Sequence, residues 1–122
     1  MAVQIRRASE GPQPGDGRRI LVDRIWPRGR SRADLRLDAW LKEVAPSHEL
    51  RRWFGHEAER WPEFRRRYRA ELARPEVEAL LGDLESTARN GTLTLVYSAA
   101  DRDHNQAVVL AELLAERIAA KR

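Results

Sequence analysis

Two short runs of apolar residues constrain the fold of this chain more than any other feature. Ile20-Leu21-Val22 lies in a predicted strand over residues 19–25, and Leu93-Thr94-Leu95-Val96 lies in a predicted strand over residues 92–98. Successive side chains of a strand point to opposite faces, so an uninterrupted apolar run suits a strand covered on both faces, as in parallel sheets. The intervening residues 31–89 read as a helical crossover, which normally joins parallel neighbours. We therefore predict that these two strands are adjacent and parallel.

A further strand precedes this pair and a helix follows it. Val3–Ala8 begins with apolar and polar residues in alternation, and the loop that follows is rich in Gly and Pro, which leaves the direction of this strand open. A last helix is expected from about Asn105 to Ala120. The fold class is thus predicted to be α/β, with a small, mainly parallel three-stranded sheet, a helical middle section and a C-terminal helix in a three-layer, Rossmann-like arrangement.

The middle section is predicted to hold four helices, each with apolar residues at intervals of three and four. The first starts at a cap, Ser31 or Asp34. Its expected buried face comprises Leu35, Leu37, Trp40, Leu41 and Val44. Ser47 caps a second helix that ends at Gly55. Pro62 must lie in the first turn of the third helix or mark a kink, and Pro75 suits the first turn of the fourth. We expect Trp40 and Trp61 to be core residues.

Length and composition restrict the class of protein. The 122 residues suit one domain, 1–122, and 42% of them are hydrophobic, as in globular proteins. Cysteine is absent, which excludes disulfides, thiolate metal sites and a cysteine nucleophile. Because no apolar segment resembles a signal peptide or a membrane span, we expect a cytoplasmic protein without membrane association.

The net charge of +4 raises the possibility of nucleic-acid binding, which we do not favour. Nearly all the basic residues are Arg, a bias that codon drift in a GC-rich genome would produce. The densest run, Arg65-Arg66-Arg67-Tyr68-Arg69, would spread around a helix with Glu63 and Glu71 nearby, as expected of a solvated face.

Polar side chains follow the strand over residues 19–25. Ligands of open α/β sheets bind outside the carboxyl ends of the strands. Arg24 and Arg28 could hold a phosphate or carboxylate through forked hydrogen bonds, and Trp26 could stack on a ring. Asp23 could act as a base. The alternative is that Asp23 and Arg24 pair with neighbours and hold the junction between strand and loop.

A second polar group follows the strand over residues 92–98, which ends in Tyr97, a candidate ligand contact. Asp101 and Asn105 could bind a ligand, and the imidazole of His104 could move protons. Alternatively, Asp103 caps the last helix with Gln106 completing a capping box. The spacing matches no metal signature, so we expect no metal site, and it indicates no particular cofactor. His56, after the glycine that ends the second helix, could also face a cleft, although histidines near helix ends are more often structural.

Three stretches of this sequence together resemble the YeaO-like branch of a bacterial family, domain of unknown function 488. They are the run Leu21 to Gly29, the region from Trp40 through Ala45-Pro46 to His56, and the run Tyr97 to Asp101 with His104-Asn105. Pro62 and Ser98 are small departures, and we expect neither to touch the polar motif residues. The resemblance implies a compact α/β domain and no established substrate or catalytic residue. It supports treating the Asp23 and Asp101 segments as one site.

The interpretation that follows is a protein that binds an anionic small molecule, such as a nucleotide or sugar phosphate, at the strand ends. An enzymatic role, with Asp23 or His104 moving protons, stays open. The alternatives are a nucleic-acid-associated protein that uses the arginines of the middle helices, and an interaction module without chemistry.

Overall fold

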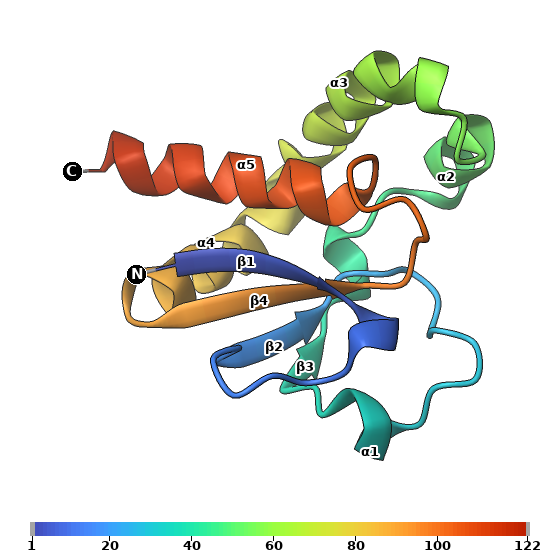
Figure 1. Cartoon of the computed structure of the whole chain (residues 1–122). Helices are drawn as coiled ribbons and strands as arrows, with labels where there is room; N and C mark the ends of the chain where they lie inside the picture. The colour runs from blue at the N-terminus through green and yellow to red at the C-terminus, as the bar shows by residue number, and fades with distance from the viewer. Residues whose placement is uncertain (1, 122) are drawn as a thin grey trace.

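The computed structural model describes residues 2–121, in which four strands form one parallel sheet (Figure 1). The strands are β1 (Ala2–Arg7), β2 (Arg18–Leu21), β3 (Ala39–Trp40) and β4 (Thr92–Tyr97), in the order β1-β4-β2-β3. The pairing of β2 with β4 is parallel, which confirms the predicted topology. β1 is parallel as well, but it pairs with β4 on the side away from β2.

The strand β3 corrects the sequence prediction, which gave three strands and a helix through Trp40. The helix α1 (Arg32–Leu35) begins at the Ser31 cap but ends after one turn, where Arg36 adopts the left-handed conformation with φ of 45°. Asp38 then pairs with β2, since its N–H donates to the Arg19 carbonyl and its carboxylate accepts from the Arg19 N–H, both at 2.8 Å. The open edge of β2 thus binds this segment as a strand, because backbone pairing satisfies donors and acceptors that a helix would leave exposed at the sheet edge.

The remaining helices follow the predicted order. They are α2 (His48–Phe54), α3 (Trp61–Leu72), α4 (Pro75–Arg89) and α5 (Gln106–Ala120). Ser47 caps α2, whose C-cap Gly55 has a φ of 53°, and proline stands in the first turns of α3 and α4. One-turn 3₁₀ helices occupy Ala8–Glu10, Lys42–Val44 and Ala58–Arg60. Among residues 2–121, no helix has the length and apolar character needed to cross a bilayer.

The two faces of the sheet are covered unequally. In Figure 1, α5 lies above the sheet and α4 behind it, and this side holds the larger core, which includes Ile20, Leu95 and Leu110. The opposite face has a thin layer in which Leu21 and Val96 of the sheet meet Leu35 of α1. Trp61 packs, half-buried, against the larger core and Trp40 against the smaller cluster, so both border the apolar interior rather than filling its centre.

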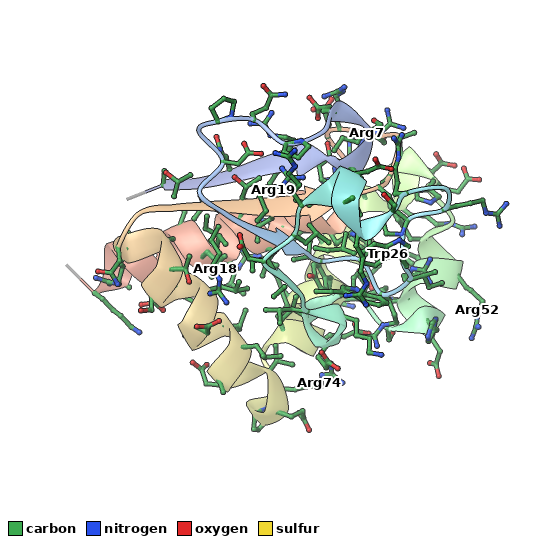
Figure 2. The ribbon with its side chains drawn as sticks, turned by 90° about the horizontal axis from the view of Figure 1, so that it is seen from below. Arg7, Arg18, Arg19, Trp26, Arg52 and Arg74 are labelled. Atoms are coloured by element: carbon green, nitrogen blue, oxygen red, sulfur yellow. The ribbon has the colours of Figure 1, made fainter. Side chains whose placement is uncertain are left out.

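A buried carboxylate fixes the loop that leads from β1 to β2. Asp16 is 2% exposed and accepts hydrogen bonds from Arg6 Nε at 2.9 Å, from Gln13 N at 3.1 Å and from Arg19. Thr94 of β4 donates to the Asp16 carbonyl at 2.6 Å, which ties the loop to the central strand. Seen from below in Figure 2, α1 lies in front of the sheet beside Arg19, whose guanidinium also donates to the Leu35 carbonyl.

Gly17 lets this loop approach the sheet closely. Its φ is +62°, and a Cβ at this position would lie 2.3 Å from the Thr92 carbonyl oxygen. Only glycine fits there without displacing the start of β4.

Candidate functional site

A cavity of about 540 Å³ opens at the carboxyl ends of β2 and β4. Its walls come from the loop after β2, the loop between β4 and α5, and parts of α2 and α3. The structure brings to this cavity seven of the eight candidate residues, which are Asp23, Arg24, Trp26, Arg28, Asp101, His104 and Asn105. The eighth, Tyr97, is 2% exposed and does not line the cavity.

Asp23 is the most deeply placed acid of the cavity. Its carboxylate accepts a hydrogen bond from the Ser98 hydroxyl and another from the Gln106 side-chain amide, each at 2.5 Å. Burial raises the pKa of Asp23, an effect that these two donors and the nearby Arg51 charge oppose. Asp23 therefore joins the ends of β2 and β4 to the start of α5. Ser98 was expected to leave the polar residues untouched, and this contact shows that expectation to be wrong.

Two of the candidate ligand residues already use their side chains in hydrogen bonds to other parts of the protein. Arg24 donates from Nε to the Pro46 carbonyl at 2.9 Å and from Nη2 to the Ala45 carbonyl at 3.0 Å, so it clamps the chain before α2. Asn105 is the N-cap of α5, because its side-chain oxygen accepts from Val108 N at 3.2 Å. The cap was expected at Asp103. This residue is instead exposed, and its N–H donates to the Asp101 carboxylate. Asn105 is favoured because its second group, Nδ2, reaches the Asp101 carbonyl at 2.9 Å.

His104 and Asp101 form a pair at the cavity wall. His104 Nδ1 lies 2.9 Å from Asp101 Oδ2, and the same carboxylate accepts the His104 N–H at 3.0 Å. The hydrogen bond with His104 is the main reason why the pKa of Asp101 is lowered. The imidazole also meets the Trp61 ring edge-on, with centroids 5.2 Å apart. With Nδ1 directed at Asp101, Nε2 is the nitrogen available to a bound molecule.

Two arginines give the cavity its uncompensated charge. Arg28 comes from the loop after β2 and Arg51 from α2; both are exposed, and neither has a carboxylate partner among the described residues. Three arginines, Arg24, Arg28 and Arg51, line the cavity together with two aspartates, so cationic side chains outnumber acidic ones there. An anion placed there would gain charge-assisted, forked hydrogen bonds.

The cavity also has an aromatic side. Phe54 and Phe64 stack with their centroids 4.3 Å apart, and both line the cavity together with Trp26. At the rim, Ile25 leaves 54% of its surface exposed, which is unusual for a large apolar side chain in this structure. The cavity therefore combines cationic side chains with an aromatic and apolar wall.

Several cavity residues were not singled out from sequence. Arg51, Phe54 and Phe64 face the cavity from α2 and α3, where helical periodicity alone does not show which turn meets a strand end. Gln106 had been interpreted only as part of a capping box. His56, which was weighed and not favoured, does line the cavity, and its φ of 59° places it in the left-handed region directly after Gly55. Within residues 2–121, no three His, Asp or Glu side chains gather closely enough to hold a metal ion.

The sequence matches those of known proteins over nearly its whole length. Residues 2–122 match a family model described as the inactive DUF488-N3 subclade. The chain is similar to the uncharacterized protein YeaO of Escherichia coli strain K12, with 46% identity over 114 residues, or 93% of this chain and 97% of that protein. It is also similar to the uncharacterized proteins Mb3100c of Mycobacterium bovis and Rv3073c of Mycobacterium tuberculosis, each 42% identical over 112 residues and 92% of both chains. No solved structure matches significantly.

Proposed function

This chain belongs to the DUF488 family, and on that premise we propose that its cavity binds an anionic small molecule, a nucleotide or sugar phosphate, at the carboxyl ends of β2 and β4. The observation that carries the proposal is the pair Arg28 and Arg51, which enter one cavity from two elements without a carboxylate partner in the described chain. Guanidinium groups left without acidic partners at a concave site are suited to phosphate oxygens.

The other features of the cavity support a nucleotide more than a sugar phosphate. A volume of about 540 Å³ is within the range of small-molecule sites. Phe54, Phe64 and Trp26 offer aromatic surface to a flat ring, whereas a sugar would need more hydrogen-bonding groups. His104, oriented by Asp101, could exchange a proton with such a ligand, but the description of the subclade as inactive favours binding without chemistry.

The proposal predicts that phosphorylated ligands stabilise the protein against heat. A nucleoside monophosphate at about 100 times its Kd should add roughly 2.7 kcal/mol to the free energy of unfolding, whereas the uncharged nucleoside should add much less. Differential scanning fluorimetry at fixed ionic strength with nucleoside monophosphates, ribose 5-phosphate and inorganic phosphate measures this. If no phosphorylated compound raises the melting temperature, the proposal is wrong.

Variants of the two arginines test the site itself. Arg28→Ala or Arg51→Ala removes a charged hydrogen bond worth about 1.5–3 kcal/mol, so each should weaken binding roughly 10- to 100-fold in isothermal titration calorimetry. Arg74→Ala is the matched control, because Arg74 is exposed, lacks a carboxylate partner among the described residues and does not line the cavity. Equal affinities for the three variants would show that the cavity does not hold the anion.

A further inference from the structure

The arginine run that the sequence offers for nucleic-acid binding is neutralised by ion pairs. Arg65 lies 2.7 Å from Glu112 of α5, and Arg69 lies 2.5 Å from Glu116. Arg66 and Arg67 share Glu63, at 2.6 and 2.7 Å. These pairs leave little charge on α3 for an external polyanion.

A different segment carries free positive charge. Arg28, Arg30, Arg32 and Arg36 are all exposed, and among the described residues none has a carboxylate partner. We call residues 28–36 the arginine loop. Asp34 lies within the arginine loop and accepts from Ser31 N at 3.2 Å, so the four arginines exceed the acids of the loop by three charges. Asp38, just beyond the loop, accepts from Arg19 N at 2.8 Å.

An indole ring stands at the base of the arginine loop. Trp26 donates from Nε1 to the Arg30 carbonyl at 2.7 Å, and the Arg32 guanidinium lies 5.9 Å from its ring centroid. Trp40 meets the Trp26 ring edge-on at 5.5 Å between centroids. Figure 2 shows Trp26 beside α1 on the lower side of the molecule.

Trp26 separates two hollows in the surface. On one side it lines the cavity of about 540 Å³. On the other it lines a smaller hollow of about 150 Å³, together with Arg32, Leu37, Asp38, Ala39 and Trp40. Arg28 borders the first hollow and Arg32 the second, so aromatic surface and cationic groups alternate across the indole.

We propose that the arginine loop and Trp26 form a docking surface for single-stranded nucleic acid. Proteins that bind single strands combine cationic grooves for the phosphates with aromatic side chains for the bases. Two hollows separated by an indole suit neighbouring bases of an unstacked strand, and the loop guanidinium groups suit the phosphates between them. A duplex would keep its bases stacked and away from the hollows. An acidic protein would use the charge but not the aromatic surface. The surface goes beyond the cavity function, because it recognises a polymer through Arg30, Arg32 and Arg36, which do not line the cavity.

Fluorescence anisotropy with a short labelled oligothymidylate, at salt concentrations between about 50 and 200 mM, tests the surface. The variant carries Arg30→Gln, Arg32→Gln and Arg36→Asn, with Asn chosen because position 36 has a φ of 45°. Its Kd should rise at least about tenfold at low salt, and the slope of log K against log salt should fall by about 2, because single strands give roughly 0.7 per phosphate contact. The matched control, Arg65→Gln with Arg66→Gln and Arg67→Gln, removes the same charge and should change Kd less than about threefold.

Four results would overturn the proposal: no binding of the oligothymidylate, equal losses for the two triple variants, tighter binding of a duplex than of the single strand, or tighter binding of a polyglutamate peptide than of the single strand. Arg30→Gln alone should weaken binding in the same direction, which guards against a folding defect of the triple variant. The cavity is assessed separately, because the triple variant should keep the thermal shift that a nucleoside monophosphate gives. Loss of strand binding with that shift intact separates the two functions.

Discussion

Asp23 connects three elements through one buried carboxylate. It follows β2, accepts from Ser98 after β4, and accepts from Gln106 in the first turn of α5. Trp40 adds a fourth element, β3, since its Nε1 donates to the Asp23 carbonyl at 2.6 Å. The residue that sequence placed at the chemical centre of the site is therefore also the junction that shapes the cavity.

The raised pKa of Asp23 predicts a pH-dependent effect of Asp23→Asn. Because burial raises this pKa above its ordinary 3.8, the folded protein binds more protons than the unfolded chain between that value and the folded-state pKa. The stability contributed by this residue therefore falls as the pH rises through that interval. Asn does not titrate, so the free energy of unfolding of the variant, relative to that of the wild type, should increase as the pH rises above 3.8. Urea denaturation across this range measures the difference, and a constant offset would contradict the expected titration.

The sequence located the site well at this scale but assigned several roles wrongly. Position after a strand was enough to bring Asp23, Arg28 and His104 to one cavity. It was not enough to show that Arg24 clamps backbone carbonyls or that Asn105 caps α5, because both depend on where neighbouring backbone groups lie in space. The type of a residue shows which hydrogen bonds its side chain can make. Only the tertiary structure shows whether those hydrogen bonds are already made within the protein.

At the scale of elements, one acid joins α4 to α5. Glu85 of α4 is 4% exposed and contacts Lys121 at 2.9 Å, Arg117 at 2.9 Å and Arg89 at 3.2 Å. The Lys121 ammonium, followed by Arg117 and Arg89, lowers the pKa of Glu85 from 4.5 to about 2. The packing of these two long helices therefore depends partly on charge.

This network predicts the acid sensitivity of the helix pair. Because its pKa is lowered, ionised Glu85 stabilises the fold above pH 4.5, and this contribution is lost as the pH falls towards about 2. Glu85→Gln should therefore be less stable than wild type near neutral pH, and the gap should close through this range. Glu76→Gln, at an exposed position of α4 without an ion pair in the described chain, is the control. If the two variants show the same acid profile in urea denaturation, the network does not set the stability of the pair.

The elements differ in how well sequence predicts them. Caps and prolines marked the starts of α2, α3 and α4 because they act on the nearest backbone groups. The segment from Leu35 to Val44 has helical spacing and yet forms one helical turn, β3 and a 3₁₀ turn. The interaction that decides the structure there is the hydrogen bond between Asp38 and Arg19. These residues lie in separate segments of the chain, so the hydrophobic periodicity of one segment cannot predict their contact.

For the whole molecule, stability rests on two apolar layers of different thickness. Trp40→Ala would open the thin layer, which has few other large side chains, and Trp61→Ala would remove a ring that contacts Phe54 and Phe64 on the other side. Both tryptophans are half-buried, so each change should cost about 3 kcal/mol, the lower end for buried aromatics. Guanidinium denaturation measures both losses. A loss below about 1 kcal/mol for either variant would mean that its layer contributes little to the fold.

The strand order affects how this protein folds while the ribosome synthesises it. β1 and β2 each pair with β4, which begins only at Thr92. Within residues 2–121, the other partner of β2 is the two-residue strand β3. At roughly 5–20 residues per second, the strands made first wait on the order of 5 to 20 seconds for the strand that joins them. Throughout that time Ile20, Leu21 and Val22 have no completed sheet to cover them. The sheet therefore cannot form before β4 has been synthesised, and a nascent chain that still lacks β4 exposes an aggregation-prone apolar run.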